Sequence, residues 1–156
     1  MNVSRRQWIQ SAIASGISCT LPLVSNPQLR AAANEPSILI RQITQGPRHH
    51  WFGYYDKLQF SPDGRYVLGM EVAFEHRTPN PDDAIRIGMV DLQANDRWTD
   101  LGESVAWNWQ QGCMLQWIPG TQSQILWNDR EEDQFVCRIL DVTTGEGRTI
   151  KQPIYA

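Results

Sequence analysis

The sequence predicts an all-β protein that contains the first two four-stranded blades of a β-propeller. Three observations carry this prediction: short apolar runs bounded by turn residues, no helical hydrophobic period beyond the N-terminal segment, and an order of strands and turns that occurs twice. A four-strand unit repeated after about 50 residues is typical of propeller blades. A small β-sandwich is the alternative, because it also uses many short strands.

The N-terminal residues resemble a twin-arginine export signal. Residues 4–9 hold two arginines followed by an aromatic and an aliphatic residue, and a mildly apolar stretch then leads to the small residues 31–33. We expect residues 1–33 to be a signal peptide recognised by the twin-arginine translocon, and the mature protein to be periplasmic or secreted. A membrane anchor is the alternative, but polar residues interrupt the stretch, and a span needs about 20 mostly apolar residues.

The first repeat unit is assigned to residues 34–104. Residues 38–40 form a short apolar lead-in strand, and a Ser-Pro-Asp-Gly turn at 61–64 separates the first two strands of the blade. The four strands of this blade are expected at 57–60, 65–72, 85–92 and 97–101.

The second repeat unit is assigned to residues 105–156, with strands at 115–117, 124–128, 135–142 and 148–150. Leu115-Gln116-Trp117 repeats Leu58-Gln59-Phe60 after 57 residues, and Asp141 repeats Asp91 after 50 residues. A propeller ring has typically 4–8 blades. We therefore expect an incomplete fragment of a larger ring, or else a marginal product that assembles with copies of itself.

Charge and cysteine content exclude several classes of protein. The net charge is −3, and because residues 1–33 carry three arginines and no acid, the remainder stands at −6. Nucleic acid as a partner is excluded, since phosphates require a basic surface. No Cys-x-x-Cys spacing indicates a zinc or redox site, and a lipoprotein anchor at Cys19 is disfavoured. Cys113 and Cys137 are expected as two buried free thiols, because an intervening strand separates them; a disulfide is the alternative.

Strand direction predicts where the unusual side chains gather. In an antiparallel meander the second-to-third loops and the links between blades lie at one end, opposite the short generic turns. The segments at this end are 49–56, 75–78, 107–111 and 128–131, which hold all three histidines of the chain. Function tends to reside on loops that a rigid scaffold holds, although packing between blades would also account for Trp107 and Trp109.

The candidate residues come from these segments. Proton transfer or carboxylate binding is assigned to the catalytic candidates His50, Tyr54, Asp56 and Arg130, and ligand binding to Trp51, Trp109, Gln111 and Asp129. We expect no metal site within this chain, because the adjacent residues His49 and His50 point to opposite sides of an extended strand.

Three motifs carry a resemblance to a known family. His49 to Lys57, Ala106 to Trp117 and Asn128 to Glu131 resemble an uncharacterised family of exported bacterial propellers, which is distantly similar to oligogalacturonate lyases. The resemblance implies a ring of about seven blades and, through blades absent from this chain, a divalent metal and a lyase-like activity.

The function expected from the sequence is binding or processing of a carbohydrate-like ligand, such as an oligosaccharide, on the end that bears the interblade loops. Whether the chain is an enzyme stays open. The alternatives are a non-catalytic propeller scaffold for protein interaction and an inactive truncated product.

Overall fold

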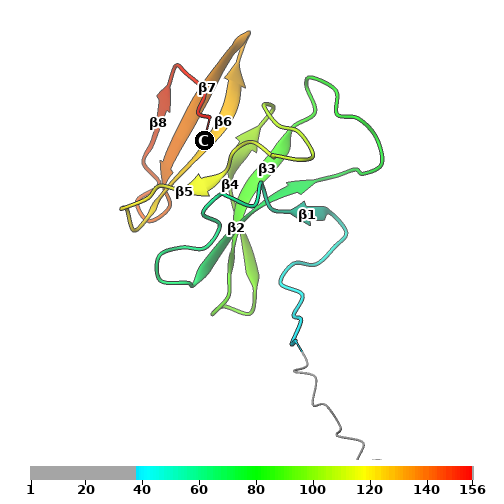
Figure 1. The fold of residues 1–156 in the computed structure, drawn as a ribbon, viewed down its shortest axis with the longest axis vertical. Helices are drawn as coiled ribbons and strands as arrows, with labels where there is room; N and C mark the ends of the chain where they lie inside the picture. Colours follow the sequence, from blue (N-terminus) through cyan, green and yellow to red (C-terminus); the bar gives the residue numbers. More distant parts are fainter. Residues whose placement is uncertain (1–37, 156) are drawn as a thin grey trace, which may run out of the picture. The chain divides into compact units, whose positions relative to one another are not determined.

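The computed structural model describes residues 38–155, in which two four-stranded antiparallel sheets contain all the strands (Figure 1). The first sheet has the strand order β1-β2-β3-β4 and the second the order β5-β6-β7-β8. Their bounds are β1 His49–Trp51, β2 Tyr66–Val72, β3 Ile85–Asp91, β4 Arg97–Ser104, β5 Gln116–Trp117, β6 Gln124–Glu131, β7 Gln134–Asp141 and β8 Gly147–Ile150. The described residues contain no helix, which confirms the all-β prediction. The predicted signal peptide at 1–33 lies outside the described residues.

The two sheets repeat one another in detail at the end of their third strands. Asp91 and Asp141 are the last residues of β3 and β7. The Asp91 carboxylate accepts two hydrogen bonds from Arg65 (2.6 and 3.0 Å), and the Asp141 carboxylate accepts one from Ser123 (2.7 Å). Arg65 and Ser123 each stand immediately before the second strand of their sheet. Both carboxylates also accept backbone N–H groups of the turn that follows, so each ties the start of the second strand to the third-to-fourth turn.

Alternation along the strands divides each sheet into two faces. In β2, Leu68, Met70 and Val72 belong to the buried cluster between the sheets, so Gly69 and Glu71 point the other way. We call the faces that meet the inner faces, and the opposite ones the outward faces. The same parity places Ile125 and Trp127 of β6 on an inner face and Leu126 and Asn128 on an outward face.

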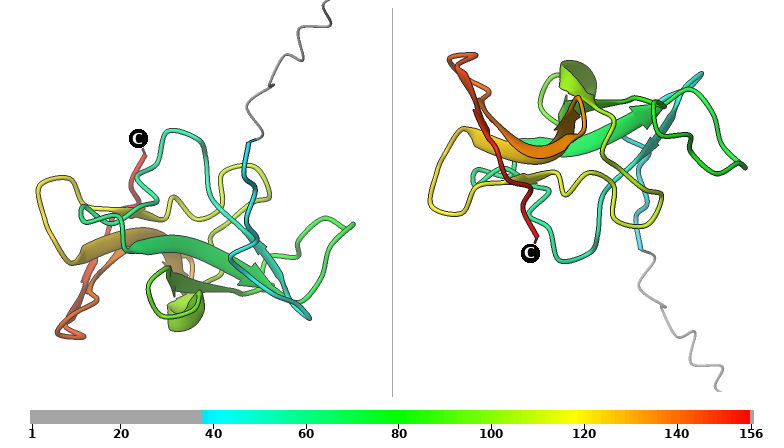
Figure 2. Two further views of the ribbon diagram at one scale, coloured as in Figure 1. Left: turned by 90° about the horizontal axis from the view of Figure 1, so that it is seen from below. Right: turned by 90° about the horizontal axis from the view of Figure 1, so that it is seen from above.

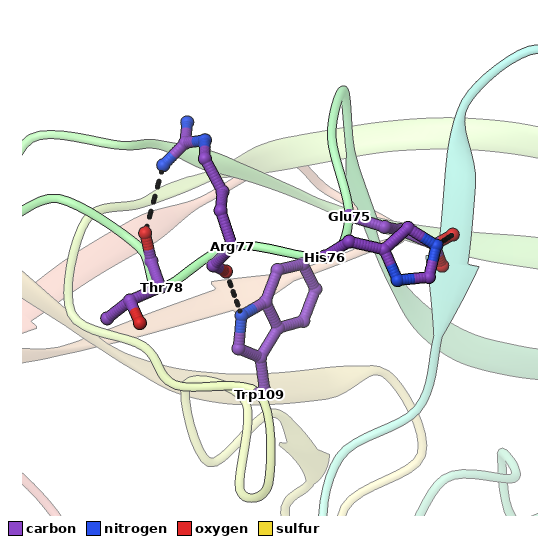
Figure 3. Close-up of a pocket in the computed structure, with 5 residues that line it drawn as sticks. All are labelled: Glu75, His76, Arg77, Thr78 and Trp109. Atoms are coloured by element: carbon purple, nitrogen blue, oxygen red, sulfur yellow. Dashed lines mark hydrogen bonds and ion pairs between the residues drawn. The ribbon is translucent and has the colours of Figure 1, made fainter.

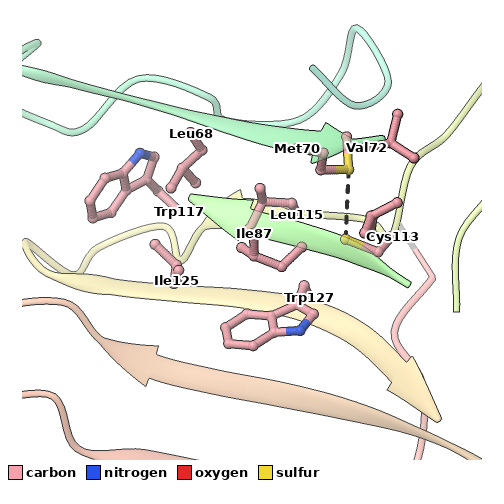
Figure 4. Close-up of a cluster of buried hydrophobic side chains, with 10 residues drawn as sticks. Leu68, Met70, Val72, Ile87, Cys113, Leu115, Trp117, Ile125 and Trp127 are labelled. Carbon is pink, nitrogen blue, oxygen red and sulfur yellow. Dashed lines mark hydrogen bonds between the residues drawn. The ribbon is translucent and has the colours of Figure 1, made fainter. Parts of the chain in front are cut away.

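The core lies between the inner faces (Figure 4). Trp117 and Trp127 are its largest members, and both indole N–H groups donate across the sheets, to the backbone oxygens of Gln59 and Glu103 at 3.0 Å each. Gly102 leaves room for Trp127, because a Cβ there would lie 3.1 Å from the indole. These contacts bury two large aromatics without leaving their polar N–H groups unpaired.

The predicted first strand at 57–60 is wrong in its position. The first strand is β1, which pairs with the Met70–Val72 end of β2, and only Phe60 rejoins β2 through an isolated bridge to Val67. Residues 52–58, which we call the excursion, leave the sheet between these two contacts. They contain a turn closed by the bond from Lys57 N to Tyr54 O (3.1 Å). The hydrophobic pattern of the sequence does not reveal that the first strand of the sheet is interrupted in this way.

Two further expectations are corrected. Residues 38–40 form no strand, and their side chains are exposed; an apolar run becomes a strand only where an edge is available to pair with it. Residues 128–131 were expected in a loop but continue β6 to Glu131, so the connection to β7 is a tight turn at 132–133.

Figure 2 shows the residues after β8 returning past β6, where Ile154 and the Asn128 side chain exchange two hydrogen bonds of 2.8 Å.

Cys113 and Cys137 are both buried free thiols, as predicted. Cys113 belongs to the core between the inner faces, where its Sγ lies 3.7 Å from the sulfur of Met70. Cys137 pairs in register with Asn128 and so lies on the outward face of the second sheet. Both β6 and the thickness of the sheet separate the two thiols.

Candidate functional site

The antiparallel order brings the chemically rich connections to one end, as predicted. The β2–β3 connection at 73–84, the β4–β5 link at 105–115 and the β6–β7 turn all leave their sheets in the same sense. Side-chain contacts join them: Arg130 of β6 donates to the backbone oxygen of Pro81 (2.9 Å) and to the Asp82 carboxylate (2.8 Å).

An aromatic cluster occupies this end of the first sheet. The rings of Trp51, Trp107 and Trp109 contact one another with centroids 5.0 to 5.5 Å apart. Phe74 completes the cluster, with its centroid 5.7 Å from Trp109 and 6.2 Å from Trp107. Offset and edge-to-face pairs at such distances contribute about 0.5–1.5 kcal/mol each beyond their buried area. The cluster therefore holds the β2–β3 connection against the β4–β5 link.

Two indole N–H groups of the cluster clamp the β2–β3 connection. Trp107 donates to the backbone oxygen of Asp83 (2.6 Å), and Trp109 donates to that of Arg77 (2.9 Å). The Trp51 N–H is buried without a partner. Trp107 and Trp109 thus stabilise the β2–β3 connection, which agrees with the alternative that they are packing residues.

A hollow of about 540 Å³ opens beside the cluster (Figure 3). Glu75, His76, Arg77, Thr78 and Trp109 line it, and we call it the Trp109 hollow. Trp109 keeps 37% of its surface exposed, and the His76 side chain is 94% exposed. His76 has a φ of 62°, in the left-handed region, so the backbone turns sharply at the rim of the hollow.

The charges around the hollow are largely paired already. Arg77 donates to both Asp83 carboxylate oxygens (2.6 and 2.9 Å), and its guanidinium lies 3.4 Å from the Phe74 ring centroid. The bonds from Arg77 and from the Asn80 N–H lower the pKa of the Asp83 carboxyl to about 2. Glu75 lies 3.1 Å from His49 Nδ1. A ligand therefore meets an aromatic ring and small polar groups before it meets a free charge.

Of the predicted ligand-binding residues, the structure brings together Trp51 and Trp109 alone. Gln111 lines a second hollow, of about 460 Å³, on the outward side of the second sheet, and Arg130 lines the same hollow. Asp129 is engaged structurally: its carboxylate accepts the Val105 N–H (3.1 Å) and pairs with Arg138 (3.0 Å).

The structure places His50 away from the Trp109 hollow. His50 and Trp51 are neighbours on β1, so their side chains point to opposite faces of the sheet. His50 Nε2 lies 3.1 Å from a Glu71 carboxylate oxygen, and its ring meets Trp98 edge-on at 4.9 Å. These residues belong to the outward face of the first sheet.

Tyr54 and Asp56 lie in the excursion. The Tyr54 ring packs on that of Tyr55 with centroids 4.4 Å apart. The Asp56 carboxylate lies 2.8 Å from the ammonium nitrogen of Lys57, whose side chain is only 2% exposed. The four catalytic candidates thus have separate surroundings, and the geometry forms no shared proton-transfer site among them.

Phe74 and the pairing of Arg77 with Asp83 were not anticipated from the sequence. Phe74 stands two residues after the predicted second strand ends. An aromatic residue near the start of a loop rich in charged and polar residues was the available signal. No local pattern could show that Asp83 would neutralise Arg77, because a loop turn brings the two together.

Within residues 38–155 no three His, Cys, Asp or Glu side chains are grouped as metal ligands would be. The same stretch holds no helix of the length and apolar character that a membrane span requires. Comparison of the chain with protein-family models, with curated proteins and with solved structures finds no match.

Proposed function

We propose that the two sheets are adjacent blades of a β-propeller. The repeated meander, the matching roles of Asp91 and Asp141 and the face-to-face packing of the sheets support this assignment. Rings of this type contain typically 4–8 such sheets, so the two described sheets would form part of one.

We further propose that the Trp109 hollow binds a carbohydrate. The observation that carries this proposal is the partly exposed indole of Trp109, fixed in place by three aromatic neighbours and by its bond to Arg77. A rigid aromatic ring offers broad contact at little cost in rotamer entropy, and the apolar C–H face of a pyranose fits such a ring. Thr78, His76 and Glu75 supply hydrogen-bonding groups at the rim.

The paired charges favour a neutral sugar over a uronate. Arg77 is bound by Asp83 and Arg130 by Asp82, so a sugar carboxylate would have to displace an existing partner or lie near acids. Glu75 adds a carboxylate to the wall of the hollow. We therefore expect oligomers of neutral hexoses to bind more tightly than oligogalacturonate.

Isothermal titration of the full chain with neutral and acidic oligosaccharides tests the proposal. Trp109→Ala should remove binding, whereas Trp109→Phe should retain part of it, because the ring remains while the bond to Arg77 is lost. Phe60→Ala is the control, since Phe60 is also exposed (60%) but lies far along the sheet from the β2–β3 connection. Absence of any sugar that binds, or equal binding by Trp109→Ala, would contradict the assignment.

Export by the twin-arginine route to the periplasm or the exterior is a separate proposal, supported by the residue pattern at 4–9. Replacement of Arg5 and Arg6 by lysine should leave the protein in the cytoplasmic fraction of a host that carries the translocon. Unchanged export of that variant would contradict the proposal.

A non-catalytic scaffold is the second candidate. It is favoured by the two indole N–H groups that clamp the protein's own loop, and by apolar side chains left exposed on the outward face of the second sheet. A polysaccharide-lyase-like reaction has less support, because the catalytic candidates are not gathered.

A further inference from the structure

The hollow of about 460 Å³ on the outward side of the second sheet has a mostly apolar wall. The wall runs from Met114, which is 8% exposed, to Phe135, which is 55% exposed. The residues after β8, which return past β6 (Figure 2), add Ile154 and Tyr155 to it. A concave and largely apolar surface of this size, with a few polar groups, is typical of a site for a small molecule.

Hydrogen bonds hold the wall of this hollow in place. Ile154 and the Asn128 side chain exchange two bonds of 2.8 Å. The backbones of Asn108 and Gly112 exchange two more, of 2.9 and 3.2 Å, and so close the turn between them. The indole N–H of Trp107, another wall residue, donates to the β2–β3 connection at 2.6 Å. The hollow is therefore formed before a ligand arrives, so binding costs little ordering of the chain.

Arg130 presents hydrogen-bond donors at this hollow that are not fully used. Its Nη2 donates to the Pro81 backbone oxygen (2.9 Å) and to the Asp82 carboxylate (2.8 Å), but within residues 38–155 its Nη1 and Nε have no partner. The Asp82 side chain is 93% exposed. An ion pair so open to water contributes little stability, so another anion can displace Asp82 from Arg130.

The charge of the lining residues favours an anionic ligand. Arg130 is the only charged side chain among the described residues that line the hollow, and Gln111 adds an amide nitrogen that donates to no other described residue. Asp141 lies on the same face of the sheet, but it is the last residue of β7, whereas Arg130 pairs with the start of that strand. The Trp109 hollow differs in this respect, because Glu75 lines it.

We propose that this second hollow binds a small carboxylic acid with an apolar, aromatic body. The carboxylate bonds to Nη1 of Arg130 and, once Asp82 is displaced, to Nη2 as well, which is the two-bond geometry that guanidinium and carboxylate groups favour. The three aromatic side chains of the wall favour a ring as the body of the ligand. The site is separate from the Trp109 hollow, so either proposal can fail without the other.

Isothermal titration of the full chain with 3-phenylpropionate tests the proposal. We expect one-to-one binding, and the uncharged amide of the same acid should bind at least about tenfold more weakly, because it lacks the charge-assisted bonds to Arg130. Galacturonate, which has a carboxylate but no apolar body, should also bind at least about tenfold more weakly. Equal binding of 3-phenylpropionate and either of these compounds contradicts the proposal, and so does the absence of binding by 3-phenylpropionate in the millimolar range.

Variants of the charged residues distinguish a site from a general effect of charge. Arg130→Gln should reduce binding of 3-phenylpropionate to the level of its amide. Arg148→Gln is the matched control, because Arg148 belongs to the neighbouring strand β8 and does not line the hollow. Asp82→Ala should tighten binding about threefold, since it removes the competing carboxylate of an exposed ion pair. Equal losses in the two arginine variants, or no gain in Asp82→Ala, would overturn the assignment of the carboxylate to Arg130.

Two further variants place the ligand and guard against misfolding. Phe135→Ala should weaken 3-phenylpropionate and its amide by similar factors, because the ring of both packs on the wall. Arg130→Lys, which keeps the charge but loses the two-bond geometry, should bind with intermediate affinity. Circular dichroism checks that each variant is folded, and if Arg130→Gln is not, Arg130→Lys and the exposed Asp82→Ala decide. Unchanged binding by Phe135→Ala means that the ligand lies elsewhere and contradicts the proposal.

Discussion

The indole of Trp98 lies so close over Gly88 that a Cβ at this glycine would stand 2.2 Å from indole Cζ2. The same Cβ would lie 2.7 Å from the backbone oxygen of Thr99. Gly88 pairs in register with Gly69, so two glycines form the floor on which this ring rests. Because these two positions carry no side chain, the indole of Trp98 can lie close against the outward face of the first sheet and cover it there.

Gly88→Ala should therefore destabilise the protein. The methyl group cannot be accommodated by a flexible side chain alone, because the Thr99 contact is with the backbone, and overpacking of this kind costs about 1–3 kcal/mol. The midpoint of urea unfolding measures the change. Gly147→Ala is the matched control, since its Cβ would meet only the Ile139 oxygen, at 3.6 Å. A Gly88→Ala variant as stable as this control would show that Trp98 does not rest on the glycine.

The pairing of Arg77 with Asp83 predicts a pH dependence at the Trp109 hollow. The pKa of Asp83 falls from 3.8 to about 2 on folding. A lowered folded-state pKa adds stability that is complete above 3.8 and is lost as the pH falls through about 2. The hydrogen-exchange protection factors of the β2–β3 connection, in which the intrinsic pH dependence of exchange is divided out, should stay constant down to pH 4 and fall between pH 3.8 and 2. Arg77→Gln should remove most of this dependence, and an unchanged profile in that variant would assign it to other groups.

Much of the fold follows from the sequence because its signals are local. The turns at 61–64 and 143–145 contain Gly64 and Gly145 with φ values of 70° and 77°, which few other residues adopt. Asp91 and Asp141 recur because the same cap is needed at the end of each third strand. Strand direction then places the long connections at one end.

The sequence does not predict which residues form the site. Strand direction determines at which end of the sheet a residue lies, but not to which face its side chain points. His50 and Trp51 are adjacent, and yet they serve opposite faces of the first sheet. Asp129 was a binding candidate in a predicted loop, but β6 continues through it and Arg138 neutralises it. Such outcomes depend on partners distant in the chain, which no local pattern encodes.

The buried ammonium of Lys57 makes Asp56 a structural residue. The Lys57 side chain is 2% exposed and lies 2.8 Å from the Asp56 carboxylate, which is itself 45% exposed. Asp56→Asn should cost about 1–3 kcal/mol of unfolding free energy, below the value for a fully buried pair because water reaches the carboxylate. Asp56→Asn combined with Lys57→Met should recover most of the loss. If the double variant is no more stable than the single one, the carboxylate is not what compensates the buried charge.

The two described thiols should be inert in the folded protein, for reasons that differ between them. Burial in the core between the sheets raises the pKa of Cys113 to about 12. Burial also raises the pKa of Cys137, which lies outside that core cluster. Only the thiolate reacts, so the raised pKa suppresses the reactive form of Cys113 in the folded protein. In a Cys19→Ser variant, which removes the third thiol of the chain, a disulfide-exchange reagent should modify neither cysteine in the absence of urea.

The order in which Cys113 and Cys137 react distinguishes local fraying of a strand from unfolding of the whole protein. Cys137 lies under the outward face of the second sheet, next to the four-residue edge strand β8, so fraying of that strand exposes it first. Cys113 requires separation of the sheets, because it packs against Met70. At urea concentrations below the unfolding midpoint, Cys137 should therefore be modified before Cys113, as Cys113→Ala and Cys137→Ala variants would show. Simultaneous modification of the two would mean that the second sheet opens only with the whole structure.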